Sequence, residues 1–248
     1  MHILLLGGTT EASLMARTLA DAGVQATFSY AGRTLSPVAQ PMPIRVGGFG
    51  GVAGLINYLR TSGTTHVIDA THPFAAGMSA NAFAACQRTS TPLIRLERAP
   101  WRPQQGDDWR RVPKVEDLPR ALPDAPARVF LAIGKQQIGV FASHPQHHYL
   151  LRLVDAPVAP LPLPDTTVIL ARGPFDRAGD TALLREHRIT HVMCKNAGGA
   201  GARAKLDAAR ALGLPVIMAD RPVLPGNKVA DSPAQVMNWL HHGAERGV

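Results

Sequence analysis

A glycine-threonine turn near the N-terminus is the first stretch whose residue types could do chemistry. It consists of Gly7, Gly8, Thr9, Thr10 and Glu11. The turn follows an apolar run, residues 3–6, and precedes an Ala-rich stretch typical of a helix. Glycines let a phosphate approach the backbone, and the free amides at a helix start attract anions. We therefore expect a nucleotide phosphate here, with Glu11 meeting a hydroxyl or the helix cap. A ligand-free turn is the alternative, because the Gly-x-Gly-x-x-Gly pattern is absent.

The residues after the second apolar run indicate which dinucleotide would bind. In NAD-binding folds, an Asp or Glu about 20 residues after the glycines binds both ribose hydroxyls. Here residues 26–30 end at Tyr30 and lead to Gly32, Arg33 and Thr34, without a carboxylate, and these four residues are assigned to the cofactor. Arg33 and Thr34 are suited to a 2′-phosphate, and Arg33 also to an adenine face. The stretch favours NADP, bound as NADPH or NADP⁺, over NAD. A surface arginine in a glycine turn is the other interpretation.

A glycine-rich loop follows the third apolar run. Residues 47–51 hold four glycines in five positions. Glycine permits close approach of the backbone to a ligand, so Gly47 and Gly48 are assigned to the cofactor. A mobile loop without a ligand is the alternative.

Polar and aromatic residues follow the fourth apolar run. They are Asp69, Thr71, His72 and Phe74. Thr71 is suited to the cofactor and Phe74 to stacking on a flat ligand. Reduction by a dinucleotide needs a proton as well as a hydride, so Asp69 and His72 are candidates for proton delivery or positioning. Water is the other proton source, and a purely structural role is the alternative for His72.

Basic and amide groups follow successive apolar runs in the second half of the chain. They are Lys135, Gln136, Gln137, Arg172, Lys195, Asn196, Gly198 and Gly199. Each group lies at a strand-to-helix junction, where helix amides add to the positive field. We therefore expect a cradle for a small polyanion, with ordinary surface cations as the alternative. Arg203 and Lys205, inside the next helical stretch, are expected to be solvated.

Short apolar runs alternate with helical patterns over most of the chain, which is typical of parallel strands buried on both faces. A Pro-rich stretch, residues 100–126, interrupts the alternation, and we expect connecting structure there because proline lacks an N–H. The prediction is an α/β fold of two doubly wound parallel-sheet subdomains with a cleft between them. Residues 1–124 would bind NADP and include the connector, and residues 125–248 would contribute the polyanion site.

Composition narrows the kind of partner. The formal net charge of +8 indicates an acidic partner, and the scattered basic residues favour a small polyanion over nucleic acid. No apolar stretch reaches the length of a membrane span. Cys86 and Cys194 lack a metal-ligand spacing, so we expect no metal site and no disulfide framework. These features are typical of a cytoplasmic protein.

Nine strings in order along the chain resemble the precorrin-6A reductase family. They are LLLGGTTEA (4–12), AGR (31–33), RVGGFGG (45–51), VIDATHPFA (67–75), MSANA (78–82), GDDWRRV (106–112), FLAIGKQ (130–136), ILARGPF (169–175) and CKNAGG (194–199). The resemblance implies two Rossmann-like domains with cofactor and macrocycle in the cleft. Its implied activity is NADPH-dependent reduction of one double bond of precorrin-6A to dihydro-precorrin-6 (precorrin-6B) in cobalamin biosynthesis. Ala197 departs from the serine expected in the family, so a hydroxyl there is not required.

The implied substrate is a polycarboxylate tetrapyrrole, which suits the basic groups of the second half. We expect a monomer with transient contacts to other enzymes of the pathway. The relative that acts on the cobalt-containing form has similar motifs, so that substrate stays open. A different NADP-dependent oxidoreductase for a polyanionic small molecule stays open too, as does a non-catalytic protein that senses NADP or binds nucleic acid. The non-catalytic protein predicts interleaved aromatic and basic residues, which are missing.

Overall fold

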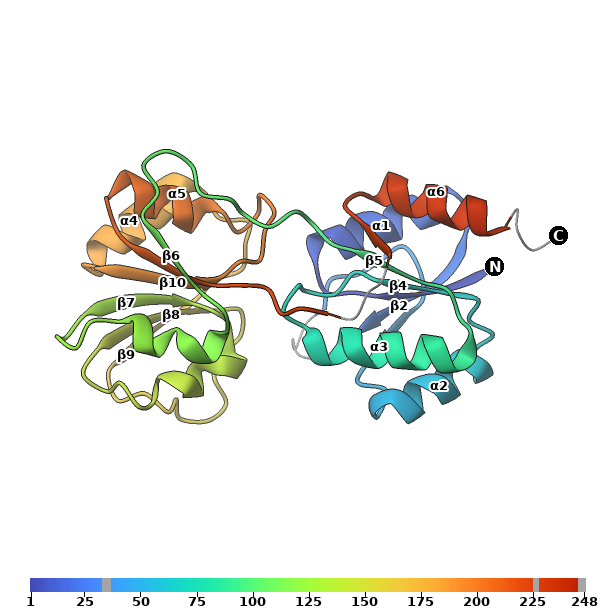
Figure 1. Cartoon of the computed structure of the whole chain (residues 1–248), viewed down its shortest axis with the longest axis horizontal. Helices are drawn as coiled ribbons and strands as arrows, with labels where there is room; N and C mark the ends of the chain where they lie inside the picture. Colours follow the sequence, from blue (N-terminus) through green and yellow to red (C-terminus); the bar gives the residue numbers. More distant parts are fainter. Residues whose placement is uncertain (33–36, 225–227, 245–248) are drawn as a thin grey trace. The chain divides into compact units, whose positions relative to one another are not determined.

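The chain forms two compact units, each built on its own sheet. The structure is a computed structural model, and it describes residues 1–32, 37–224 and 228–244. Unit 1 comprises Met1–Ala99 and Val223–Val248, and unit 2 comprises Pro100–Pro222. Each unit contains a six-stranded parallel sheet with helices (Figure 1). The predicted α/β class with two parallel sheets is confirmed.

The division differs from the expected boundary between residues 124 and 125. Strand β6 (Trp109–Val112) pairs with β11 (Val216–Ala219) in unit 2, and β12 (Lys228–Ala230) pairs with β5 (Leu93–Leu96) in unit 1. The chain therefore enters unit 2 at Pro100 and returns to unit 1 at Val223. The surrounding prolines obscure β6 in the sequence pattern, and β12, with the sequence Lys-Val-Ala, is too short and too polar at its start to stand out as an apolar run.

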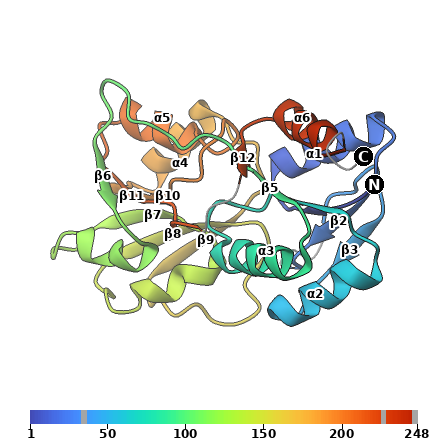
Figure 2. The same cartoon turned by 45° about the vertical axis from the view of Figure 1, so that its right-hand side comes forward.

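The sheet of unit 1 has the strand order β12-β5-β4-β1-β2-β3. Its remaining elements are β1 (His2–Leu6), α1 (Thr10–Asp21), β2 (Gln25–Tyr30), β3 (Ile44–Val46), α2 (Gly51–Thr61), β4 (His66–Asp69), α3 (Ala76–Thr89) and α6 (Pro233–Ala244). Helices α1 and α6 cover one face of the sheet, and α2 and α3 cover the other (Figures 1 and 2). Ile3 and Leu5 of β1 pack toward α1 and α6. Leu4 and Leu6 pack toward α2 and α3, so the strand needs apolar residues at every position.

The sheet of unit 2 has the strand order β6-β11-β10-β7-β8-β9. Its remaining elements are the 3-10 segments η1 (Val115–Asp117), η2 (Pro119–Ala121) and η3 (Lys135–Phe141), the strands β7 (Arg128–Ala132), β8 (His148–Leu153), β9 (Thr166–Leu170) and β10 (His191–Lys195), and the helices α4 (Arg177–Glu186) and α5 (Ala204–Ala211). Helices α4 and α5 pack against one face through Leu184 and Leu206. The helix expected after β7 is the 3-10 segment η3. Asp176 caps the start of helix α4, accepting the Gly179 N–H at 2.8 Å.

Both sheets reverse their strand order at one place, and this locates the sites. In unit 1 the chain leaves β1 in one direction for β2 and β3, and later adds β4 on the other side of β1. In unit 2 the equivalent reversal lies between β7 and β10. Ligands of open parallel sheets bind beyond the carboxyl ends of the strands at such a switch point. The loops after β1, β4, β7 and β10 are therefore the ones to consider.

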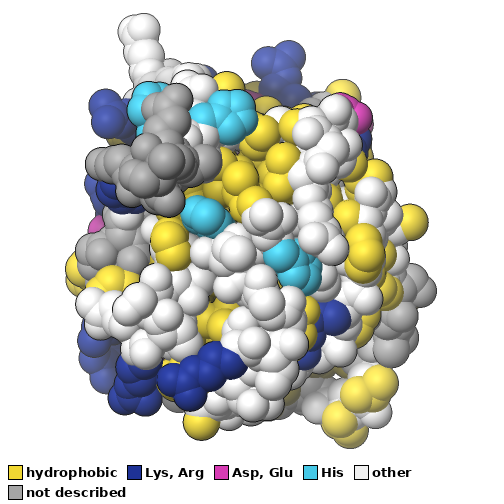
Figure 3. All heavy atoms as spheres, turned by 90° about the vertical axis from the view of Figure 1, so that its right-hand side faces the viewer, with side chains coloured by type: hydrophobic (Ala, Val, Ile, Leu, Met, Phe, Trp, Pro, Cys, Tyr) yellow, Lys and Arg dark blue, Asp and Glu magenta, His cyan; other side chains and the backbone are white. Residues whose placement is uncertain are grey.

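The opposite edge of the unit 1 sheet, where its strands begin, carries two shallow hollows. One has a volume of about 360 Å³ and is bordered by Lys228 and Trp239, and the other, of about 320 Å³, is bordered by His2 and Met42. On the face drawn in Figure 3, hydrophobic and histidine side chains gather and acidic side chains are scarce. Neither hollow includes a residue that the sequence assigns to a site. Within the described ranges, no helix is both long and apolar enough to span a bilayer.

His147 is a histidine buried in unit 2. Its side chain is fully buried, and its Nδ1 accepts the Ala127 N–H at 3.1 Å. Burial lowers the pKa of His147 from 6.5, and the charges of His144 and His191 would lower it further. His147 is therefore a structural group that is kept neutral by the fold.

Acid is expected to destabilise the protein through this residue. Because the pKa of His147 is lower in the folded than in the unfolded state, its stability contribution is complete above about pH 6.5. Below that pH the unfolded state takes up the proton first, which costs at most about 1.4 kcal/mol per pH unit. Urea unfolding at pH 7.5 and 5.5 measures this effect. The free energy of unfolding should decrease less between the two pH values for His147→Asn than for the wild type, and the Asn side-chain carbonyl can still accept the Ala127 N–H. His241→Asn, which replaces an exposed histidine, is the control and should show the same decrease as the wild type. A decrease in His147→Asn as large as that of the wild type would show that His147 is not the source of the acid sensitivity.

Candidate functional site

The turn after β1 needs glycine at two successive positions. Gly8 has φ of +119°, a conformation that side chains rarely adopt. At Gly7 the constraint is space, since a Cβ there would lie 2.1 Å from Cζ of the buried Phe28. The Gly7 N–H donates to the Ser29 carbonyl at 3.0 Å, which ties the turn to the end of β2. The sequence-based prediction of a tight turn at this strand end agrees with this geometry.

Thr9 connects the turn to the loop after β4. It is the N-cap of α1, and its Oγ1 accepts the Ala12 N–H at 3.1 Å. The same hydroxyl donates to the Ala70 carbonyl at 2.8 Å. The Ala70 N–H in turn donates to the Leu6 carbonyl at 2.9 Å. The two loops at the switch point of unit 1 are thus held together beside the amino end of α1, where anions are favoured.

Glu11, in the first turn of α1, forms an ion pair rather than a cap. Its Oε2 lies 2.6 Å from Nη1 of Arg98, and the two side chains are only 24% and 17% exposed. Arg98 lies two residues after the end of β5 and is 87 residues from Glu11 along the chain. Sequence reasoning missed Arg98, because nothing local marks such a distant partner. The pair compensates the negative charge that Glu11 would otherwise place next to the glycine turn after β1.

The loops after β2 and β3 lie against each other. The Gly47 N–H donates to the Tyr30 carbonyl at 2.9 Å, and a Cβ on Gly32 would lie 3.4 Å from Cα of Gly47. Tyr30 itself is 9% exposed, and its hydroxyl donates to the Val38 carbonyl at 2.8 Å. Its side chain therefore belongs to the core of unit 1 rather than to a ligand surface. Arg33 and Thr34, the residues expected to read a 2′-phosphate, lie outside the described residues.

Asp69 organises the loop after β4 from a buried position. Its side chain is not exposed to solvent, and its Oδ1 accepts the N–H and the hydroxyl of Thr71 at 3.1 and 2.6 Å. Its Oδ2 accepts the Ser79 hydroxyl at 2.6 Å and lies 3.7 Å from Nε of Arg95. Both oxygens are engaged inside the protein. The geometry favours a structural role for Asp69 over the proton delivery that the sequence allowed.

His72 and Phe74 are half-buried in the same loop. The Phe74 N–H donates to Nδ1 of His72 at 3.2 Å, and the centroids of the two rings are 5.9 Å apart. This bond fixes the orientation of the imidazole with Nδ1 as acceptor. Of the two candidates for proton delivery, Asp69 and His72, His72 is therefore the better one.

In unit 2, two lysines follow the strands at the switch point. Lys135 is exposed and begins η3, directly after Gly134, whose φ is +77°. Lys195 is the last residue of β10 and is half-buried. Since β7 and β10 are neighbours in a parallel sheet, the two cations belong to the same edge. Gln136 is exposed beside Lys135, and Gln137 donates to Glu116 at 3.4 Å.

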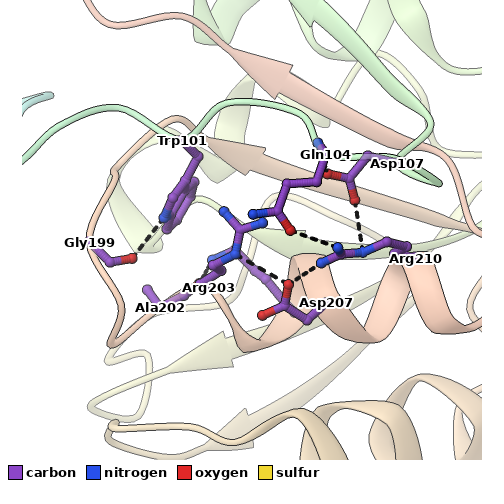
Figure 4. A network of polar contacts seen from close by, with 9 residues as sticks. Trp101, Gln104, Asp107, Gly199, Ala202, Arg203, Asp207 and Arg210 are labelled. Carbon is purple, nitrogen blue, oxygen red and sulfur yellow. Dashed lines mark hydrogen bonds and ion pairs between the residues drawn. The ribbon is translucent and has the colours of Figure 1, made fainter.

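Asn196 fastens the loop after β10 to the Pro-rich connector. Its side chain accepts the Trp101 N–H at 2.8 Å and donates to the Trp101 carbonyl at 3.1 Å. The indole N–H of Trp101 donates to the Gly199 carbonyl at 2.7 Å (Figure 4). Asn196 is 4% exposed, so its amide positions the loop and is not presented to a substrate. Gly198 and Gly199 have φ of +70° and +76°, which explains the glycines at this bend.

The start of α5 strengthens the same attachment. Lys205 is 5% exposed, donates to the Ala202 carbonyl, and its Nζ lies 4.6 Å from the ring centroid of Trp101. The expectation of a solvated Lys205 is therefore wrong, since the indole provides a face for the ammonium group. Further along α5, Arg210 donates to Gln104 at 2.8 Å and lies 3.3 Å from Asp107 (Figure 4). The Pro-rich connector, residues 100–126, is thus packed and hydrogen-bonded as part of unit 2.

Arg172 is exposed just after β9, two strands away from β7. The same loop packs on Arg152, which pairs with Asp180 and whose Cζ lies 3.6 Å from the ring centroid of Phe175. Arg172 therefore extends the basic edge beyond the two lysines. The separation suits a ligand with several carboxylates spread over a wide framework.

The comparisons with known proteins agree with this architecture. The sequence profile of the precorrin-6x reductase CbiJ/CobK family matches residues 2–241. The precorrin-6A reductase of Rhodobacter capsulatus is 63% identical over 249 residues, covering 100% of this chain and 99% of that protein. The cobalt-precorrin-6A reductase of Priestia megaterium is 28% identical, covering 96% of this chain and 97% of that protein.

A solved structure points the same way. The chain of a CobK precorrin-6A reductase matches with a TM-score of 0.94 and 62% identity, covering 98% of this chain and 96% of that one. The family resemblance of the nine strings is thus confirmed by sequence and by structure. The chain belongs to the precorrin-6x reductase CbiJ/CobK family.

Proposed function

We propose that this protein uses NADPH to reduce one double bond of precorrin-6A, giving dihydro-precorrin-6 (precorrin-6B) in cobalamin biosynthesis. The observation that carries the proposal is the 63% identity to a precorrin-6A reductase over the whole chain. The cobalt-containing substrate is the second candidate, because the family also includes cobalt-precorrin-6A reductases. Identity favours the cobalt-free form, at 63% and 45% for two precorrin-6A reductases against 28% for a cobalt-precorrin-6A reductase.

The residues of unit 1 fit a dinucleotide. The turn at Gly7 and Gly8 leaves the amides of Thr10 and Glu11 at the start of α1 for the diphosphate, because Thr9 already caps Ala12. The loop of Gly47 and Gly48 stands next to the end of β2, where the adenosine ribose would lie. The bound nicotinamide would supply the hydride.

The residues of unit 2 fit the substrate carboxylates. Lys135, Lys195 and Arg172 would bind them at the carboxyl-end edge, and the backbone around Gly198 and Gly199 would approach the ligand closely. Asn196 would act by holding this loop in place. His72 would hold or transfer the proton that completes the reduction, with water as the alternative donor.

The function is tested directly with purified protein, precorrin-6A and NADPH. We expect loss of NADPH together with a change in macrocycle absorbance, and a lower rate with NADH. The same assay with cobalt-precorrin-6A separates the two substrates. Absence of turnover with either macrocycle, in protein that is shown to be folded, would refute the proposal.

Removal of the two switch-point lysines should weaken substrate binding. Lys135→Ala and Lys195→Ala each delete one charge-assisted contact, so we expect the KM for the macrocycle to rise about tenfold. The KM for NADPH should stay within about twofold, because neither lysine belongs to the cofactor unit. Lys114→Ala, which removes an exposed lysine elsewhere in unit 2, is the matched control. An unchanged KM for the macrocycle in both variants would show that the two lysines are ordinary surface residues without a role in substrate binding.

The Glu11–Arg98 pair should matter for the cofactor rather than for the substrate. Arg98→Met leaves a carboxylate beside the phosphate turn, and an unpaired negative charge near the diphosphate costs roughly 1–2 kcal/mol, or about tenfold in NADPH affinity. Adding Glu11→Gln to Arg98→Met removes the repulsion and should restore most of the affinity. Direct titration of NADPH measures both effects, with exposed Arg88→Met as control. No rescue in the double variant would show that charge compensation is not the reason for the pair.

A further inference from the structure

Arg45 of β3 is held at the end of β2. Its Nη1 donates to the Ser29 hydroxyl and to the Gly47 carbonyl, both at 2.8 Å, and its Nη2 donates to the Gly48 carbonyl at 3.1 Å. The register places Arg45 directly opposite Ser29 across the two strands. The guanidinium therefore spans the last residues of β2 and the glycine loop after β3.

Aromatic side chains keep the guanidinium in this position. Its Cζ lies 3.8 Å from the ring centroid of Phe49 and 5.3 Å from that of Tyr58 in α2. The two rings pack edge to face with centroids 5.2 Å apart, so they form a fixed surface. An arginine that is stacked and bonded in this way is pre-organised for binding an anion.

Neutral oxygens, rather than carboxylates, accept the hydrogen bonds that Arg45 makes within the described residues. Among the ion pairs of the described residues, none includes Arg45. A guanidinium has five N–H groups, and these bonds account for three of them. A positive charge with remaining donors thus stands at the end of β2.

The end of β2 is where dinucleotide folds recognise the adenosine ribose. Folds that bind NAD place a carboxylate there for the ribose hydroxyls. Residues 29–32 read Ser-Tyr-Ala-Gly and contain none. A fixed cation in that place instead favours a ribose that carries a 2′-phosphate.

We propose that Arg45 is a specificity-determining residue that selects NADPH over NADH by attracting the 2′-phosphate. The inference rests on the proposed use of NADPH, and it gives a role to the first residue of the glycine-rich string 45–51. Arg45 also supports the loop of Gly47 and Gly48. The two roles differ in their consequences, because loss of loop support would weaken both dinucleotides, whereas loss of the 2′-phosphate contact weakens NADPH alone.

The test compares dinucleotide binding by wild type, Arg45→Met and Arg45→Lys, measured by calorimetry with NADPH and NADH. Binding of adenosine 2′,5′-bisphosphate and 5′-AMP isolates the 2′-phosphate without any turnover. We expect Arg45→Met to bind NADPH and the bisphosphate at least tenfold more weakly, and to bind NADH and 5′-AMP, which lack the 2′-phosphate, within about twofold of the wild type. Arg45→Lys, which keeps the charge, should retain part of the preference. Arg60→Met, an exposed cation on α2, is the matched control and should bind as the wild type.

The outcomes separate this inference from the function it rests on. Equal weakening of ligands with and without the 2′-phosphate, or a full NADPH preference in Arg45→Met, would overturn the role of Arg45 while leaving NADPH as cofactor. A wild type that binds NADPH and NADH equally would overturn both. If Arg45→Met does not fold, as judged by thermal unfolding, Arg45→Lys decides by whether its ratio of NADPH to NADH affinity decreases.

Discussion

Replacing Asp69 with alanine is expected to lower the free energy of unfolding by about 3–5 kcal/mol. The carboxylate is buried and accepts hydrogen bonds from the hydroxyls of Thr71 and Ser79. In the alanine variant these two hydroxyls would lose their acceptor. It also lies 3.7 Å from Arg95, which is 7% exposed. Glu97, 3.0 Å from Arg95, would compensate only part of the buried charge. Urea unfolding of the variant measures the loss.

Two companion variants separate stability from catalysis. Asp69→Asn keeps the shape and one acceptor oxygen, so it should lose less stability than Asp69→Ala. If Asp69 is structural, folded Asp69→Asn should retain most of its kcat. Asp21→Ala, an exposed acid at the end of α1, controls for the loss of a negative charge. A folded Asp69→Asn protein without turnover would contradict the structural role and restore Asp69 as a proton donor.

Gly54→Ala is expected to destabilise the protein by roughly 2–4 kcal/mol, although alanine is the better helix former. A Cβ at Gly54 would lie 1.6 Å from the carbonyl oxygen of Phe49, which is a backbone atom that cannot rotate away. Either α2 or the loop ending at Phe49 must then move. Because the same loop carries Gly47, Gly48 and the stacking partner of Arg45, NADPH affinity should decrease with stability.

The matched control for this change is Gly77→Ala in α3. A Cβ at Gly77 meets nothing within 4 Å, so alanine should be neutral or stabilising by up to about 1 kcal/mol there. Thermal unfolding and NADPH titration of both variants check the contrast. Equal stability of Gly54→Ala and Gly77→Ala would show that the contact with Phe49 is not limiting.

Local requirements explain what could be predicted from the sequence. A buried parallel strand needs apolar residues at each position, so β1 was recognisable from Ile3 to Leu6. The turn after it needs glycine for two local reasons, backbone conformation at Gly8 and space at Gly7. Strand β12 was not recognised, because Lys-Val-Ala forms no apolar run and takes its place in the sheet through pairing with β5.

Roles of individual polar side chains required the fold. Asn196 and Lys205 look like candidates for solvent or substrate in the sequence, yet both are buried around Trp101, about a hundred residues away. The sequence cannot indicate that these side chains are buried, since Trp101 comes from a distant segment of the chain. The same reason hid Arg98 as the partner of Glu11.

The sequence by itself determined the α/β class, the tight glycine turn after β1 and the basic groups after the strands of unit 2, because each depends on neighbouring residues. Tertiary structure alone decided the return of the last strand to unit 1, the burial of Asp69, and the position of Arg45 at the end of β2. These depend on which strand ends meet at one edge of a sheet. Strand pairing between segments far apart in the chain determines which strand ends lie together. It therefore also determines which charged side chains have a partner of opposite charge.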